Sequence, residues 1–168
     1  MQSGTVPRCV SCWLLFALIT LLQFLSNGVS GLTVHRPTYL AQRGIKSQSV
    51  SFGPPDFNGG NYRGKVLVVD KGVLCQKNAK DGSWVGSVLI TDGSDCAFGV
   101  QALRAQSAGA VGLIVAREEG GSDVGAEVNI MVERISDADY DSIVLAIKNG
   151  NAVEVTLGVP INVLRYKS

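Results

Sequence analysis

Short apolar runs that end in turn residues recur through the middle of the chain. Val66–Val69 is followed by Asp70-Lys71-Gly72, and Val88–Ile90 is followed after Thr91 by Asp92-Gly93. Val111–Val115 is a third run of this kind. Such runs are typical of strands with both faces buried, as in a parallel sheet. The pattern therefore predicts three buried strands.

The segment between the last two runs changes to a helical period. Phe98, Ala102, Ala105 and Gly109 recur at spacings of four, three and four residues. This stripe of small side chains predicts a helix that lies close to a sheet, with Gly109 at its C-terminal stop. Residues 87–115 then form a strand, helix and strand of the size of a right-handed parallel crossover.

A second helix is predicted near the C-terminus. Its apolar positions follow the spacing i, i+3, i+4 and i+7: Tyr140, Ile143, Val144 and Ile147. Ser136 with Asp139 three residues later resembles a capping box, Lys148 falls in the last turn, and Gly150 follows.

The remaining segments give weaker signals. Short strands are indicated at 33–34, 50–52, 128–132, 153–157 and 159–164. By composition, residues 53–60 form a loop rich in glycine and proline, and residues 117–127 form a charged loop rich in glycine.

The first part of the chain has the pattern of a secretory signal peptide. Trp13–Leu25 is a nearly unbroken apolar run, and Ser26–Gly31 is small and polar. As a helix the run would span about 20 Å, short of the roughly 30 Å of a bilayer core. We therefore expect a signal peptide over 1–31, cleaved after Gly31 or Ser30. An uncleaved signal anchor is the alternative.

Charge is balanced once this segment is removed. The chain has 15 Lys and Arg against 14 Asp and Glu, and the predicted signal contains one charged residue, Arg8. A neutral chain argues against nucleic acid or an anionic membrane as the main partner. No second apolar run reaches membrane length. The rest is long enough to form one domain with its own core.

Four cysteines divide between the two parts of the chain. Cys9 and Cys12 fall in the predicted signal, which leaves Cys75 and Cys96. In an oxidising compartment such a pair predicts one disulfide, worth about 3 kcal/mol in the chain-entropy model. Two buried free thiols are the alternative.

Catalytic chemistry has little support in the sequence. His35 is the only histidine, and a Ser-His-Asp or Cys-His site would need it. No close-spaced pair of zinc ligands is present. Glu118-Glu119 could act as an acid and base, although solvation of an exposed loop explains the pair more simply. We therefore expect a protein that is not an enzyme and has neither metal nor cofactor.

One acidic pattern imitates a calcium loop. Asp137, Asp139 and Asp141 alternate as its first ligands do, but Ser142 stands where glycine is needed and Lys148 where the distal glutamate is needed. A negatively charged first turn of a helix accounts for the triplet better.

Several of these segments together resemble the protease-associated (PA) domain family. The centre is the string from Gly86 to Phe98, which is similar to the family's strand, turn and C-x-F motif. Ala102–Val115 and Pro55-Asp56-Phe57 resemble further family segments, and Cys75 stands where the family often has the partner of Cys96.

The resemblance covers most of the chain and implies its organisation. It implies an α/β (α+β) fold of the swivelling β/β/α class, with a β-sandwich or barrel-like core flanked by two or more helices. The expected parts are a signal peptide at 1–31, a joining segment at 32–52, a PA-type domain at 53–164 and a tail at 165–168. The chain is thus similar to small secreted proteins built from a single PA domain.

The resemblance also implies a function without catalysis. Such domains bind protein or peptide segments, here outside the cell or in the lumen of the secretory or vacuolar pathway. We expect two binding loops, formed by Gly93, Ser94 and Asp95 and by Arg117, Glu118, Glu119, Ser122 and Asp123. Exposed amides at the Gly93–Ser94 turn could take a carboxylate. Alternatives are an accessory subunit of a peptidase, a small hydrolase and a cargo-sorting adaptor.

Overall fold

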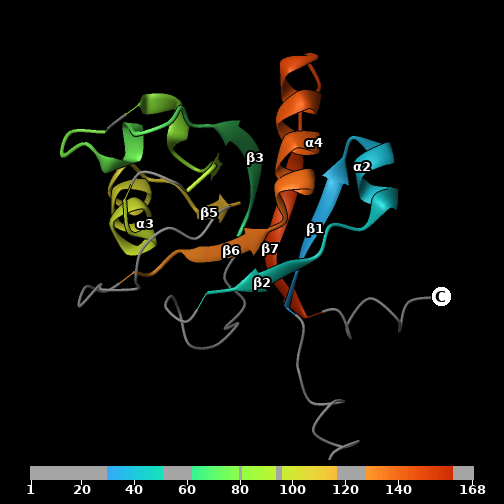
Figure 1. The fold of residues 1–168 in the computed structure, drawn as a ribbon, viewed down its shortest axis with the longest axis horizontal. Helices are drawn as coiled ribbons and strands as arrows, with labels where there is room; N and C mark the ends of the chain where they lie inside the picture. Colours follow the sequence, from blue (N-terminus) through green and yellow to red (C-terminus); the bar gives the residue numbers. More distant parts are fainter. Residues whose placement is uncertain (1–29, 51–61, 80, 94–95, 117–127, 161–168) are drawn as a thin grey trace, which may run out of the picture.

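The computed structural model describes residues 30–50, 62–79, 81–93, 96–116 and 128–160. In these parts, strands form one seven-stranded sheet in the order β1-β7-β3-β4-β5-β6-β2 (Figure 1). The strands are β1 (Ser30–Arg36), β2 (Ser47–Ser49), β3 (Arg63–Val68), β4 (Val88–Thr91), β5 (Gly112–Val115), β6 (Met131–Ile135) and β7 (Glu154–Pro160). The α-helices are α2 (Thr38–Arg43), α3 (Phe98–Ser107) and α4 (Asp137–Lys148).

The centre of the sheet is parallel. Strands β3, β4, β5 and β6 pair in parallel, and α3 connects β4 to the neighbouring β5. Every residue of β4 and β5 is buried, so the predicted crossover and both of its buried strands are confirmed. The prediction of full burial is wrong for β3, where Leu67 and Val68 are half-buried. Leu67 lies on the side of α3, which packs over β5, two strands away, whereas Val68 lies on the side of α4.

The outer strands bend the sheet into a nearly closed barrel. β7 is antiparallel to β3 and to β1, and β2 is antiparallel to β6. The edge strands β1 and β2 then meet, where the Leu32 N–H donates to Ser47 Oγ over 2.7 Å. The seam between the two edges is thus bridged by a side chain. This architecture confirms the α/β, barrel-like fold that the family resemblance implied.

Two apolar layers cover the two sides of the sheet. The layer with α4 contains Ile143 and Ala146 packed with residues such as Ile114. In the layer with α3, Phe98 and Ala102 pack against other buried apolar side chains. Figure 1 shows the two helices on opposite sides of the sheet. Burial of these apolar faces is the main favourable term in folding.

The ends of α4 follow the predicted signals. Ser136 is its N-cap, and Ser136 Oγ accepts from the Asp139 N–H at 3.2 Å. At the other end, Gly150 has φ +82°, and the Asn151 N–H donates to the Ala146 carbonyl at 3.0 Å. This is the pattern of a Schellman motif, in which glycine tolerates the left-handed conformation. The helix prediction is confirmed.

Some elements differ from the prediction. Helix α2 and the 3₁₀ turns η1 (Val73–Cys75) and η2 (Gly82–Trp84) were not predicted. Strands β2 and β6 each lie three residues from the indicated positions. Near the C-terminus β7 continues through Gly158, which adopts φ +72° without ending the strand, and residues 161–164 of the second expected strand lie outside the described part.

Most of the predicted signal peptide lies outside the described part, whereas its last two residues, Ser30 and Gly31, begin strand β1. Residues 1–29, which contain the apolar run of the expected signal peptide, lie outside the described part, as does 161–168. Among the described residues, none of the helices has the length and apolar character needed to cross a membrane.

Candidate functional site

The carboxyl ends of the parallel strands form one edge of the sheet. Thr91 at the end of β4 pairs with Val115 at the end of β5, and Val115 pairs with Arg134 of β6. The predicted loops at 93–95 and 117–123 both follow strands that end here. In open α/β sheets, ligands bind outside the carboxyl ends of the strands. We therefore take this edge as the candidate site.

Most residues of the predicted loops cannot be placed at this edge. Gly93 is described, whereas these lie outside the described residues: Ser94, Asp95, Arg117, Glu118, Glu119, Ser122 and Asp123. Their binding role stays a prediction from the sequence.

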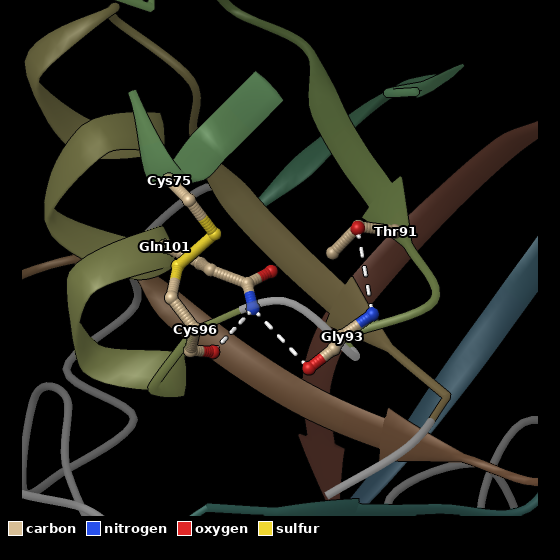
Figure 2. Close-up of a disulfide and its surroundings, with 5 residues drawn as sticks. All are labelled: Cys75, Thr91, Gly93, Cys96 and Gln101. Carbon is tan, nitrogen blue, oxygen red and sulfur yellow. Dashed lines mark hydrogen bonds between the residues drawn. A yellow bond between two sulfur atoms is a disulfide. The ribbon is translucent and has the colours of Figure 1, made fainter. Parts of the chain in front are cut away.

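The turn that follows β4 is tied down by hydrogen bonds (Figure 2). The buried Gly93 directs its N–H to Thr91 Oγ1 at 3.5 Å, and its carbonyl accepts from Gln101 Nε2 at 3.3 Å. Gln101 Nε2 also donates to the Cys96 carbonyl at 2.7 Å. Gln101 thus links the two ends of the turn. The Gly93 amide faces Thr91 and not solvent, so the expectation of an exposed amide does not hold at Gly93.

A disulfide lies beside the same turn. Cys75 and Cys96 are bonded, with Cα atoms 5.9 Å apart, and Figure 2 shows the bridge next to Gln101. The bond joins η1 to the residue just before α3, so it fixes the start of that helix relative to the edge. The predicted disulfide is confirmed in the structure.

A pocket opens where β2 and β6 meet at this edge. Its volume is about 290 Å³, and it is lined by Lys46, Ser47, Gln48, Arg134, Ile135 and Ser136. Within it, Arg134 Nη2 donates to Gln48 Oε1 at 2.6 Å. The two basic side chains make the pocket favourable for a carboxylate, which guanidinium and ammonium groups bind through charge-assisted hydrogen bonds.

Sequence reasoning missed this pocket. The one available signal was the alternation in Met131–Ile135, which turns Arg134 to the opposite face from its neighbours. The pairing of β2 with β6 brings Lys46 and Gln48 to Arg134 from a distant part of the chain.

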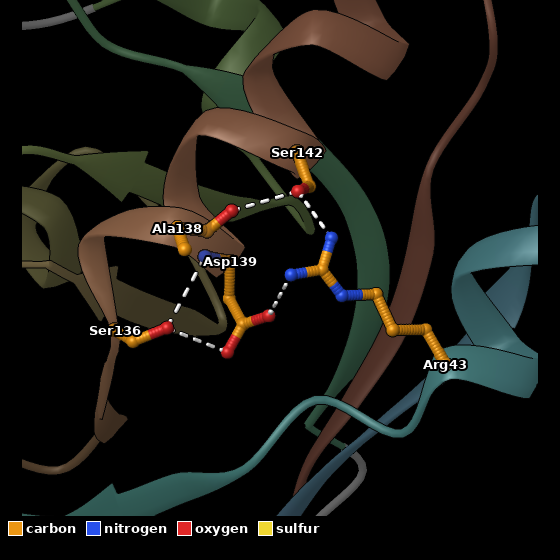
Figure 3. A network of polar contacts seen from close by, with 5 residues as sticks. All are labelled: Arg43, Ser136, Ala138, Asp139 and Ser142. Atoms are coloured by element: carbon orange, nitrogen blue, oxygen red, sulfur yellow. Dashed lines mark hydrogen bonds and ion pairs between the residues drawn. The ribbon is translucent and has the colours of Figure 1, made fainter.

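The N-terminus of α4 adjoins the pocket and holds a polar network (Figure 3). Asp139 accepts from Ser136 Oγ at 2.7 Å and pairs with Arg43 Nη2 at 3.4 Å. Arg43 Nη1 donates to Ser142 Oγ at 2.6 Å. Asp139 therefore serves the helix end, as the preferred interpretation of the acidic triplet predicted. In the described residues no group of three or more potential metal ligands occurs.

His35 lies apart from the pocket. It is exposed on β1, and its Nε2 is 2.8 Å from Thr156 Oγ1 of β7. Neither residue lines the pocket. The polar partner of His35, the only histidine of the chain, is thus the Thr156 hydroxyl.

A buried carboxyl group lies behind the pocket. Glu133 of β6 has an exposed fraction of 0%, and its two oxygens accept from Ser47 Oγ and from the Gly158 N–H. Burial raises the pKa of Glu133, while the two hydrogen bonds act in the opposite direction. Sequence analysis did not single out this residue, although its position in the alternation of β6 faces the interior.

Known proteins with a similar sequence pattern or fold were identified by comparison. The family model of the PA domain matches residues 34–152. No curated protein sequence matches the chain. The fold is similar to an aminopeptidase from Aneurinibacillus sp. strain AM-1, with a TM-score of 0.58 and 14% identity, covering 77% of this chain and 30% of that chain.

Two further solved structures are similar in fold. BSAP, a zinc aminopeptidase from Bacillus subtilis, has a TM-score of 0.55 and 19% identity, with 77% of this chain and 29% of that chain covered. A peptidase M28 precursor from Shewanella amazonensis SB2B has a TM-score of 0.56 and 17% identity, with coverages of 78% and 34%. The match thus spans about a third of each of these longer chains.

Proposed function

This chain belongs to the PA domain family, and from that premise we propose that it is a secreted or lumenal protein that binds peptide segments of partner proteins without catalysing a reaction. PA domains typically bind protein partners. The disulfide between Cys75 and Cys96 supports an oxidising compartment, where such bonds persist.

The observation that carries this proposal is the basic pocket at the carboxyl edge. Lys46 and Arg134 line it together with the amide of Gln48. Its volume of about 290 Å³ is suited to one side chain or to the end of a peptide chain, and not to the surface of a folded protein. Opposite charge attracts and orients a ligand at such a site. We infer that the preferred ligand is an extended peptide with a carboxylate group.

The test compares matched synthetic peptides on the full secreted chain. One set carries Asp and Glu, and the other has Asn and Gln at the same positions. We expect the acidic set to bind about tenfold more tightly, a difference of about 1.4 kcal/mol. The Lys46→Gln/Arg134→Gln double variant should lose this preference. Binding would be read by fluorescence anisotropy at low ionic strength, because salt screens exposed charges.

A control variant distinguishes the pocket from general charge. Lys148→Gln removes an exposed cation from the last turn of α4. The pocket lies at the other end of this helix, where its lining residue Ser136 is the N-cap. This variant should retain the preference for acidic peptides. Equal binding of the two peptide sets, or a preference that survives in the double variant, would count against the proposed site.

A second candidate function is an accessory unit of a peptidase or a small hydrolase. The similarity in fold to zinc aminopeptidases is the observation that favours it. The purified chain would be incubated with unfolded peptide substrates, and we expect no cleavage. Cleavage that disappears in His35→Ala would overturn our first proposal and assign a role to His35.

A further inference from the structure

The buried carboxyl of Glu133 lies where four strands meet. On the sheet, Glu133 pairs with Ile114 of β5 and with Ser49 of β2. Its carboxyl also accepts a hydrogen bond from Ser47 Oγ and another from the Gly158 N–H of β7. Since the Leu32 N–H of β1 donates to that same Ser47 Oγ at 2.7 Å, the carboxyl connects both edges of the barrel.

An irregularity between β1 and β7 explains why a polar group is needed here. The pairing passes from Gly31↔Val159 to Thr33↔Thr156, so β7 contains one extra residue, and Gly158 has φ +72°. A β-bulge of this kind leaves a backbone group outside the ladder. The Gly158 N–H is turned to Glu133 instead. A buried N–H without an acceptor would be costly, so the carboxyl stabilises the bulge.

Among the residues that the structure describes, no cation is placed to neutralise this carboxyl. Charged side chains on β6 and on the described elements around it are exposed or half-buried: His35, Arg36, Arg43, Lys46, Arg134, Asp137, Asp139, Asp141, Lys148 and Glu154. Glu154 is paired with Arg63 at 2.8 Å, and Asp139 is paired with Arg43. The strand beside Glu133 on its other side, β5, contributes only Gly, Leu, Ile and Val. A proton is therefore the species that can remove the charge.

We propose that Glu133 makes closure of the barrel sensitive to pH: uptake of a proton by its carboxyl tightens the seam of β1, β2, β6 and β7, and loss of that proton loosens it. An ionised carboxylate inside an apolar layer is disfavoured. In the neutral acid Oε1 still accepts from the Gly158 N–H, and the added proton lies on Oε2, which donates it to Ser47 Oγ.

The direction of the effect follows from burial. Burial raises the pKa of Glu133 in the folded protein above the ordinary value of about 4.3. The stability that this group contributes is fully present below about pH 4.3 and is lost as pH rises through the folded-state pKa. Glu154 acts in the opposite direction, because Arg63 lowers its pKa and this contribution is lost as pH falls.

The seam is also part of the candidate site. Ser47 donates to Glu133 and lines the pocket, so the same proton acts on one pocket wall. This consequence rests on the proposed function, whereas the pH-dependent seam does not. The test below uses no peptide, and its failure is therefore distinguishable from failure of peptide binding.

Amide hydrogen exchange in the full, disulfide-bonded chain tests the proposal. Protection factors, which are corrected for the intrinsic pH dependence of exchange, would be measured for the Gly158 amide between about pH 4.3 and pH 8. As pH rises through this range, we expect the protection factor to fall by up to about tenfold per pH unit, because one proton is linked to opening of the seam. In Glu133→Gln, which keeps an oxygen acceptor for Gly158, protection should not depend on pH over this window.

Glu154→Gln is the matched control, because it removes a half-buried glutamate whose pKa is lowered by Arg63, and it should leave the pH dependence at Gly158 unchanged. If Glu133→Gln does not fold, the side-chain carboxyl carbon of Glu133 is titrated by NMR in the natural chain. A midpoint above the ordinary glutamate value supports the proposal. A midpoint at or below that value, or the same pH dependence of protection in Glu133→Gln and the natural chain, overturns it.

Discussion

At the scale of single residues, Gly112 is the described glycine with the least room for a Cβ atom. A Cβ atom at this position would lie 2.3 Å from Leu157 Cδ1 and 3.3 Å from the Met131 carbonyl oxygen. Leu157 is fully buried, so its side chain has little room to move aside. Close packing of this kind makes added volume costly, since interiors are packed as densely as organic crystals.

Gly112→Ala should therefore destabilise the fold. Overpacking of a dense core typically costs about 1–3 kcal/mol, and urea unfolding would measure the change. The control is Gly82→Ala, because nothing lies within 4 Å of a Cβ at Gly82. A Gly112→Ala variant as stable as Gly82→Ala would show that Leu157 repacks without cost.

At the scale of elements, α4 depends on its N-terminal cap. Ser136 Oγ accepts from the Asp139 N–H at 3.2 Å and donates to the Asp139 carboxylate at 2.7 Å. Replacing the cap in Ser136→Ala leaves a helix N–H without its partner, so we expect a loss of about 1 kcal/mol in the free energy of unfolding.

Ser107→Ala provides the comparison for this cap. Ser107 is also exposed and lies at the end of α3, where its Oγ donates to the Leu103 carbonyl at 2.7 Å. That carbonyl belongs to the helix, and the serine caps no N-terminus, so urea unfolding should change little. Equal losses in the two variants would argue against a specific capping role for Ser136.

The elements that sequence could predict are those with a repeating pattern. Both longer helices and the buried strands β4 and β5 have such patterns, and the structure confirms them. Helix α2 has six residues, one buried side chain (Leu40) and no side-chain cap, so it leaves almost no local signal. The turn η2 buries Trp84 against distant residues. These short elements depend on tertiary contacts that no local pattern contains.

At the scale of the molecule, the candidate site combines predictable and unpredictable parts. The carboxyl edge of the parallel strands and the disulfide follow from the sequence, because buried runs and paired cysteines have direct structural consequences. The pocket does not, since Lys46 meets Arg134 only through the pairing of β2 with β6. Glu133 was missed for a related reason. Its partners Ser47 and Gly158 come together only when the barrel closes.

The disulfide between Cys75 and Cys96 should stabilise the whole domain. It closes a loop with a sequence separation of 21 residues, and the chain-entropy model gives about 3 kcal/mol for a loop of this length. We expect dithiothreitol to lower the urea midpoint of the natural chain and to leave that of Cys75→Ala/Cys96→Ala unchanged. The double variant in the absence of reductant should match the reduced natural chain, because both lack the same constraint. Midpoints of the natural chain that do not respond to the reductant, with free thiols confirmed by labelling, would contradict this assignment.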